Sequence, residues 1–169
     1  MADVPSDPPA RYVYLAGPDG FTPAGLYWHQ QVLIPAVLAA GLQPLSPWDA
    51  SDDDFAEVAA RPEGPDRRLA YRNLDFLTGD ANAALIDRSS GVLAVLDGPD
   101  VDSGTAAEIG YATKAGLAVV GLRTDSRRTG DNEGVIVNLQ VEYFIRRSGG
   151  SIHTHLEAAV GELATLVGA

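Results

Sequence analysis

The sequence of 169 residues contains no cysteine. This absence excludes both a disulfide framework and a thiolate metal site, and it permits a reducing compartment. The chain also lacks any apolar run near the roughly 20 residues that a membrane-spanning helix needs. Its first segment, MADVPSDPPARY, is polar and proline-rich rather than built like a secretory signal. We therefore expect a cytoplasmic protein without a membrane partner.

Positive charge is scarce, because 12 Lys and Arg stand against 23 Asp and Glu, for a net charge of -11. Proteins bind nucleic acid polymers through Lys and Arg that neutralise phosphates, so we expect no such polymer as a partner. The remaining composition is that of an ordinary globular protein, with 46% hydrophobic and 21% charged residues. The length suits one domain, and we expect a flexible N-terminal segment over 1–11 and a folded domain over 12–169.

Short, nearly continuous apolar runs predict the buried strands of a parallel sheet. They lie at 12–16, 91–96 and 117–122, with a weaker one at 42–45. Helical patterns lie at 24–40, 66–76, 82–89, 105–115, 135–147 and 155–167. This alternation predicts an α/β fold, a flavodoxin-like doubly wound parallel sheet of about five strands. The stretches 46–66 and 124–134 are read as irregular surface loops, with a substrate lid as the alternative for each.

Ligands of such sheets bind beyond the carboxyl ends of the strands, so the loops there are the first place to look for a site. The loop after the first strand does not match the G-x-G-x-x-G spacing of dinucleotide-binding proteins, and NAD is not expected. Gly17 and Gly20 would let a ligand approach the backbone closely, and Phe21 could stack on a base. A tight turn with a phenylalanine in the core is an equal alternative.

The segment after the strand at 91–96 carries two carboxylates and leads into a helix. Ser103 or Thr105 is expected to cap this helix, which places Glu108 in its first turns, where the helix dipole favours a carboxylate. A capping box of Thr105 and Glu108 is the structural alternative. Asp102 lies six residues before Glu108. Two carboxylates in one cleft can take different roles: one, ionised, attacks or stabilises an oxocarbenium-like sugar centre, and the other transfers a proton to the departing group. This pattern indicates glycosidic-bond chemistry.

Other chemistries fit the sequence less well. The acids between 97 and 108 do not follow the register of a calcium-binding loop, and neither a G-x-S-x-G elbow nor a Walker A motif is present. The histidines, His29, His153 and His155, show no metal-ligand spacing and are read as surface or interface residues. No metal is expected.

Four segments together resemble the nucleoside 2-deoxyribosyltransferase family. They are YLAGP at 14–18, LAVLDG at 93–98, DSGTAAEIGYA at 102–112 and NLQVEYF at 138–144. The resemblance, over about 12–145, implies a flavodoxin-like fold and a double displacement without a cofactor. In that reaction a glutamate attacks C1' of the deoxyribose and expels the nucleobase, and an incoming base then displaces the glutamate.

The resemblance also implies roles for individual residues. Glu108 takes the place of the nucleophile, Tyr14 would hold it in position, and Asp102 would exchange a proton with the nucleobase. Asn138 and Gln140 match a segment that binds the 5'-hydroxyl in a neighbouring subunit's site. A homo-oligomer, dimer or hexamer, is therefore expected.

One position departs from the family's pattern. Many members have a base-contacting aspartate four residues before an isoleucine, and alignment on Ile86 places Asn82 there, with Asp80 two residues away. An amide both donates and accepts hydrogen bonds, so Asn82 could select the base without transferring a proton. Trp48 and Asp49 are candidates to complete the base pocket.

Three functions are compatible with these residues. The first is exchange of nucleobases between 2'-deoxyribonucleosides, with free bases as the second substrate. The second is an N-glycosidase that hydrolyses nucleoside 5'-monophosphates, which would need Ser, Arg or Lys around a phosphate. The third is a non-catalytic nucleotide-binding module, in which a nucleophilic carboxylate would have no purpose.

Overall fold

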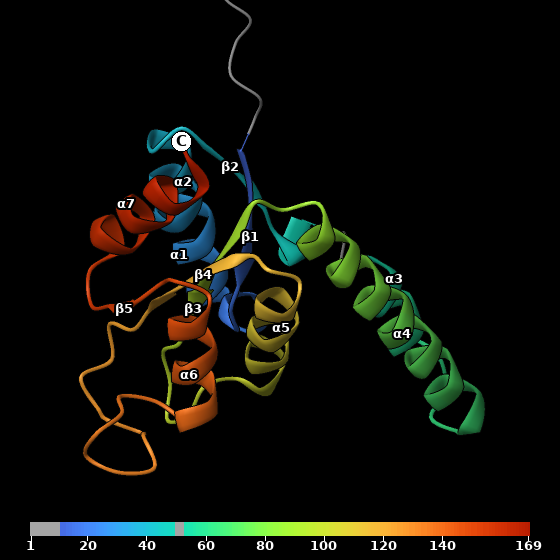
Figure 1. Cartoon of the computed structure of the whole chain (residues 1–169). Helices are drawn as coiled ribbons and strands as arrows, with labels where there is room; N and C mark the ends of the chain where they lie inside the picture. The colour runs from blue at the N-terminus through green and yellow to red at the C-terminus, as the bar shows by residue number, and fades with distance from the viewer. Residues whose placement is uncertain (1–10, 50–52) are drawn as a thin grey trace, which may run out of the picture.

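The computed structural model describes residues 11–49 and 53–169. Its five-stranded sheet is parallel throughout, in the order β2-β1-β3-β4-β5 (Figure 1). The strands are β1 (Arg11–Ala16), β2 (Leu42–Leu45), β3 (Gly91–Val95), β4 (Ala118–Leu122) and β5 (Ile152–His153). This is the flavodoxin-like order, so the predicted fold class is confirmed. The expected flexible segment at the N-terminus lies, apart from Arg11, outside the described residues.

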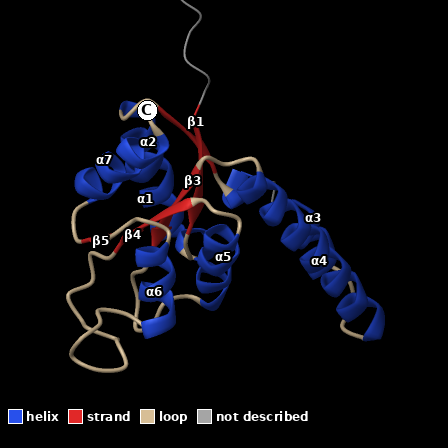
Figure 2. Cartoon of the chain, viewed as in Figure 1, coloured by secondary structure: helices blue, strands red, loops and turns tan. Residues whose placement is uncertain are grey.

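The central strands β3 and β4, and β1 from Val13 onward, are apolar because both faces of the sheet are covered there. Along β1, Val13 and Leu15 join a core with the helices of one face, while Tyr14 and Ala16 join a second core on the other. Figure 2 shows helices on both faces of the sheet. The alternation along β1 therefore points Tyr14 toward the face that carries α5 (Ser103–Lys114).

The remaining helices surround this sheet and its carboxyl edge. They are α1 (Pro23–Trp28), a π-helical turn (His29–Leu33), α2 (Ile34–Ala39), α3 (Asp53–Ala59), α4 (Pro65–Asp87), α6 (Leu139–Arg147) and α7 (Leu156–Val167), with short 3-10 turns at Asp19–Phe21 and Pro47–Asp49. α3 and α4 project together from the body of the protein (Figure 1). The predicted helix over 24–40 is present, but a π-helical turn interrupts it.

Two predictions about local structure were wrong. The separate helices expected at 66–76 and 82–89 are one continuous helix, α4, which runs through Gly79. A glycine inside a helix costs only about 1 kcal/mol relative to alanine, and α4 offsets this cost by packing against α3. The stretch 46–66 was expected to be irregular, yet it contains α3. By contrast, 124–134 contains neither helix nor strand, as predicted.

Candidate active site

A cavity of about 630 Å³ lies at the carboxyl edge of the sheet. Its walls come from four segments that are distant in sequence: the loop after β1, the segment after β2, the α3 and α4 pair, and the first turns of α5. This is the edge where doubly wound sheets bind ligands. Glu108 and Asp102 both line this cavity, which confirms that the fold brings the two predicted carboxylates to one cleft.

Glu108 and Tyr14 form a hydrogen-bonded pair beneath the cavity. The Tyr14 hydroxyl donates to Glu108 Oε1 at 2.7 Å, across 94 residues of sequence. Burial, together with the Glu108 carboxylate, raises the pKa of Tyr14 well above its ordinary value. The phenol therefore stays protonated and can act only as the donor toward the carboxylate.

The surroundings of Glu108 also shift its own ionisation. Burial raises the pKa of Glu108 above its ordinary value, the hydrogen bond from Tyr14 partly opposes this shift, and the negative charge of Asp102 adds to it. A partly desolvated carboxylate with one strong donor is more basic than a solvated one. Such perturbed groups in clefts are typical of functional sites.

Asp102 is the N-cap of α5, which corrects the expectation that Ser103 or Thr105 caps this helix. Its Oδ2 accepts from the backbone N–H of Thr105 at 2.9 Å and from the Thr105 hydroxyl at 3.2 Å. The capping box of Thr105 and Glu108 is also wrong, because the Glu108 carboxylate bonds to Tyr14 instead. The cap uses Oδ2 and leaves Oδ1 of Asp102 available to a ligand.

Aromatic rings and glycines form the wall of the cavity next to β1. Phe21 is 71% exposed, so the alternative of a core phenylalanine is wrong. Its ring and the Trp48 ring form a T-shaped pair with 4.9 Å between ring centroids. A Cβ at Gly20 would lie 2.1 Å from the Trp48 ring, so only glycine fits there. Gly17, Gly20, Phe21 and Trp48 all line the cavity, whereas Asp49 does not.

The opposite wall is one face of α4, and beside the predicted Asn82 it contains two residues that the sequence analysis missed, Asp75 and Thr78. Asp75, Thr78 and Asn82 all line the cavity. Their spacing of three and four residues places them on one side of a helix. The pattern is visible in the sequence only if the helix is read as continuous through Gly79. Asp54, from α3, adds another carboxylate to the wall, whereas Asp80 points elsewhere and is exposed.

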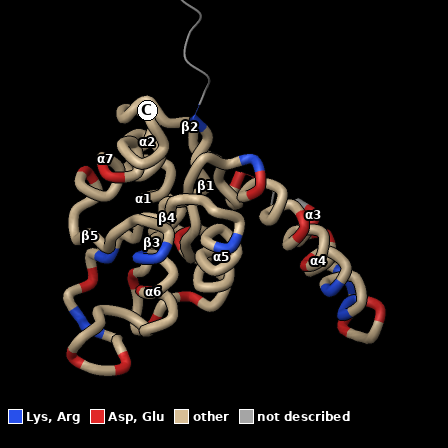
Figure 3. Tube along the Cα trace, viewed as in Figure 1, with Lys and Arg blue, Asp and Glu red and all other residues tan. Residues whose placement is uncertain are grey.

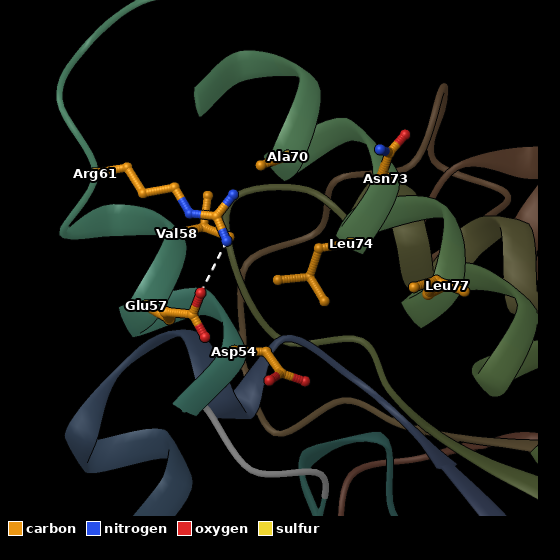
Figure 4. A pocket seen from close by; sticks show the side chains of 8 residues that line it. All are labelled: Asp54, Glu57, Val58, Arg61, Ala70, Asn73, Leu74 and Leu77. Atoms are coloured by element: carbon orange, nitrogen blue, oxygen red, sulfur yellow. Dashed lines mark hydrogen bonds and ion pairs between the residues drawn. The ribbon is translucent and has the colours of Figure 1, made fainter. Parts of the chain in front are cut away.

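A second, smaller cavity of about 340 Å³ lies beside the first, between α3 and α4 (Figure 4). The two cavities share Asp54 and Leu74 as lining residues. At the rim, Arg61 donates to Glu57 at 2.8 Å, as the dashed line in Figure 4 marks. Neither Glu108, Tyr14 nor Asp102 lines this cavity, so the larger cavity is the candidate active site.

Asn138 and Gln140 do not line the cavity of their own chain. Asn138 is the N-cap of α6, and its Oδ1 accepts from the backbone N–H of Gln140 at 3.0 Å. This cap is why α6 begins at Leu139 rather than at the expected residue 135. The Gln140 side chain is exposed.

The acid-rich loop after β3 is tied to the loop after β4. Asp97 accepts hydrogen bonds from Thr124 N, Thr124 Oγ1 and Asp125 N, at 2.6 to 2.8 Å. Buried Arg123 donates to the carbonyls of Leu96 and Gly98. Asp97 is thus engaged in holding the loop that leads to Asp102, rather than offering its oxygens to a cation.

His29 was expected at the surface, and this prediction was wrong. It is 1% exposed and lies between Asp19 and Ser46. His153 is partly exposed and pairs with Glu162 at 2.7 Å. Among residues 11–49 and 53–169, no three His, Asp or Glu side chains gather closely enough to hold a metal ion.

Acidic side chains outnumber basic ones in the chain. Figure 3 shows Lys and Arg distributed singly or in small groups along the chain, among more numerous acidic residues. Within the described part of the chain, no helix is long and apolar enough to cross a membrane.

Fold and site together define a flavodoxin-like α/β protein with a carboxylate-lined cavity at the carboxyl edge of its sheet. The model of the nucleoside 2-deoxyribosyltransferase family matches residues 13–140. The chain therefore belongs to this family, and the resemblance noted in its motifs is confirmed.

Several known proteins are similar to this chain in sequence or fold. An uncharacterized protein of Schizosaccharomyces pombe is 28% identical over 197 aligned positions, which cover 90% of this chain and 88% of that protein. Three solved structures share the fold, each matched over 92% of this chain. A conserved protein from Enterococcus faecalis has a TM-score of 0.66 at 24% identity, with 98% of its chain covered. A 2-desoxiribosyltransferase from Leishmania mexicana has 0.63 at 22%, with 97% covered. A 2-deoxyribosyltransferase from Bacillus psychrosaccharolyticus has 0.59 at 18%, with 95% covered.

Proposed function

We propose that this protein exchanges nucleobases between 2'-deoxyribonucleosides through a covalent deoxyribosyl intermediate on Glu108. The observation that carries the proposal is the pair of buried Tyr14 and partly buried Glu108, whose oxygens lie 2.7 Å apart at the wall of a cavity of nucleoside size. A carboxylate that is desolvated and held in one orientation is suited to attack a sugar carbon. Membership of the nucleoside 2-deoxyribosyltransferase family supports the same assignment.

In the first half-reaction, a Glu108 oxygen forms a bond to C1' of the donor while the bond from C1' to the base nitrogen breaks. Asp102, in its protonated form, gives its proton to the departing base, which leaves neutral. In the second half-reaction, Asp102 takes a proton from the incoming base, whose nitrogen bonds to C1' and displaces Glu108. Tyr14 keeps donating to the carboxylate, and no cofactor is required.

The walls of the cavity suit a nucleobase. Phe21 and Trp48 offer aromatic faces and edges for stacking, and Gly17 lets the ligand approach the backbone after β1. On the facing wall, the Asn82 amide can both donate to and accept from the edge of a base. Asp75 lies on the same face of α4 and is a further candidate for this contact.

We further propose that the active site is completed by a second copy of the chain. Asn138 and Gln140 lie outside the cavity of their own subunit, where they could bind the 5'-hydroxyl of a nucleoside held by a neighbour. Leu139 and Tyr143 on the same helix are 49% and 51% exposed, as expected of a surface that becomes covered on assembly.

Subunit complementation tests this arrangement. Glu108→Ala and Gln140→Ala should each be impaired alone, but hybrid dimers would contain one site with both native residues. Random mixing should then restore about one quarter of the wild-type sites. If native mass spectrometry detects hybrid dimers but the mixture recovers no exchange activity, the shared site is contradicted. Gln140 is preferred to Asn138 for this test because substitution of Asn138 also removes the cap of α6.

The cavity favours a nucleoside over a nucleoside 5'-monophosphate. Asp54, Asp75, Asp102 and Glu108 line it, and none of its described lining residues is Lys or Arg. A phosphate dianion would therefore face four carboxylates without a cationic partner. This charge arrangement supports the transferase over the hydrolase.

The test is chromatography of the products formed from deoxyinosine, with and without adenine as acceptor. Deoxyadenosine should form only when adenine is present and should be lost in Glu108→Ala. Glu157→Ala, an exposed glutamate on α7, is the matched control and should keep full activity. Equal release of hypoxanthine and free deoxyribose with and without adenine would support the hydrolase instead. Binding without turnover of any deoxynucleoside would support the non-catalytic module.

A further inference from the structure

We propose that His29 is a positioning residue that holds Trp48, and with it the aromatic wall of the cavity, in the place where a nucleobase stacks. This inference rests on the proposed function, since it concerns the binding of the base. His29 lies behind the wall and does not line the cavity. It acts through the two segments that it connects, the loop after β1 and the segment after β2.

His29 is buried between two side chains from these segments. The residue is 1% exposed. It is the first residue of the π-helical turn His29–Leu33. Nδ1 faces Asp19 Oδ2 at 3.5 Å, and Nε2 lies 2.9 Å from Ser46 Oγ. Asp19 belongs to the turn before Phe21, and Ser46 directly follows β2. The 3.5 Å contact with Asp19 falls short of a hydrogen bond, so Ser46 is the hydrogen-bond partner of the His29 ring among the described residues. Removal of the ring would leave the buried Ser46 hydroxyl without this partner, which is costly.

The hydrogen bonds continue from His29 to Trp48. Ser46 is 4% exposed, and its Oγ accepts from the backbone N–H of Trp48 at 3.1 Å. The Asp19 carboxylate favours a proton on Nδ1 of His29, which leaves Nε2 to accept the Ser46 hydroxyl proton. One continuous chain of polar contacts thus runs from Asp19 through His29 and Ser46 to the Trp48 backbone.

The position of Trp48 depends on this anchor. Its indole Nε1 is buried and has no hydrogen-bond partner among the described residues, so the ring is not held through its own polar atom. The ring packs over Gly20 and forms a T-shaped pair with Phe21. A shift of the Trp48 backbone would therefore move the surface on which a base stacks, while the Tyr14 and Glu108 pair would stay in place.

The order Asp19, His29, Ser46 matches that of a nucleophilic triad, in which a carboxylate faces Nδ1 and a serine faces Nε2. A nucleophilic role does not fit the surroundings of Ser46. Its side chain is buried, its Oγ already accepts from Trp48, and it does not line the cavity. The three side chains therefore form a structural relay, not a second reactive centre.

The kinetic test compares His29→Leu with His29→Gln. Leucine keeps the bulk of the ring but loses both polar contacts, whereas the glutamine amide can reach Ser46 as Nε2 does. We expect KM for deoxyinosine to rise roughly tenfold in His29→Leu with kcat within about twofold of wild type. His29→Gln should recover most of the loss. His155→Leu, at an exposed position that makes no side-chain cap bond, is the matched control and should behave as wild type.

A spectroscopic test does not depend on turnover. The chain contains two tryptophans, so the indole ¹H–¹⁵N spectrum has two signals, and Trp48→Phe identifies that of Trp48. In wild type this signal should be sharp and should shift on titration with deoxyinosine. In His29→Leu it should broaden or split, and His29→Gln should restore it. If His29→Leu does not fold, Ser46→Ala, which also breaks the relay, takes its place in both tests.

The outcomes separate this inference from the proposed function. An unchanged Trp48 signal and an unchanged KM in a folded His29→Leu or Ser46→Ala variant would overturn the positioning role. Loss of kcat with unchanged KM would also overturn it, because the relay would then act on the chemical step. If wild type exchanges no bases, the proposed function fails. The inference still stands in that case if deoxyinosine shifts the Trp48 signal and His29→Leu weakens that response.

Discussion

Removal of one oxygen from Tyr14 should change the pH at which the enzyme becomes active. Tyr14→Phe deletes the hydroxyl that donates to Glu108 Oε1 at 2.7 Å and leaves the ring in its fully buried place. The hydrogen bond favours the ionised carboxylate, so its loss raises the pKa of Glu108 further above the ordinary value. Because the proposed nucleophile is the ionised form, the acid limb of the activity profile should move to higher pH.

The size of the shift follows from the strength of the bond. A hydrogen bond to a charged group contributes about 1.5–3 kcal/mol, and a change of one pKa unit corresponds to about 1.4 kcal/mol. The acid limb of kcat/KM should therefore rise by about 1–2 pH units. Burial of the pair reduces solvent screening, which supports the use of this range.

The assay is the pH dependence of kcat/KM for transfer from deoxyinosine to adenine. Tyr12→Phe is the matched control, because Tyr12 lies on the same strand, is 45% exposed, and should leave the profile unchanged. An acid limb that stays in place or moves to lower pH in Tyr14→Phe would refute the view that Tyr14 stabilises the ionised nucleophile. A lower plateau of kcat/KM without a shift of the acid limb would indicate that Tyr14 only orients Glu108.

Three further outcomes are expected. Asp102→Ala should lower the free energy of unfolding by about 1 kcal/mol through loss of the α5 cap, whereas Asp102→Asn should keep the cap and stability but lose most of the exchange activity. Comparable activity in Asp102→Asn and wild type would exclude the proton-transfer role. Glu108→Gln should raise Tm at neutral pH, because the raised pKa of Glu108 makes its ionisation unfavourable in the folded state. This gain should vanish below the ordinary glutamate pKa, where both states are protonated, and an equal gain at all pH values would contradict the burial argument. Dialysis against a chelator should leave exchange activity unchanged, and a loss restored by a divalent metal would count against the mechanism.

The positions of β1, β3 and β4 were predictable because a covered parallel strand is apolar where it is buried. β3 shows this most clearly, with all of Gly91–Val95 buried. The two-residue strand β5 was not predicted, because it is too short and too exposed to form an apolar run. Helix boundaries were harder to predict, since they depend on which side chain bonds to the first free N–H groups. Near the start of α5, Asp102, Ser103 and Thr105 all have side chains that can cap a helix, and in the structure Asp102 is the N-cap.

The α4 wall shows a second limit of sequence reasoning. Gly79 looked like a break between two helices, so the shared face of Asp75, Thr78 and Asn82 was hidden, although Asn82 itself was found by resemblance. His29 shows a third limit of sequence reasoning. A histidine on a helix of mixed polarity reads as a surface residue, and its buried partners Asp19 and Ser46 come from different loops.

The sequence by itself determined the alternation of strands and helices and the placement of acidic residues after apolar runs, because both depend on local patterns of period and composition. Only the tertiary structure decided which side chains meet. Tyr14 reaches Glu108 across 94 residues because β1 and β3 are adjacent in the sheet and α5 packs over the same face. The pKa of Glu108 depends on that meeting, since burial, the Tyr14 hydrogen bond and the nearby Asp102 charge shift it, and this environment does not exist before the chain folds.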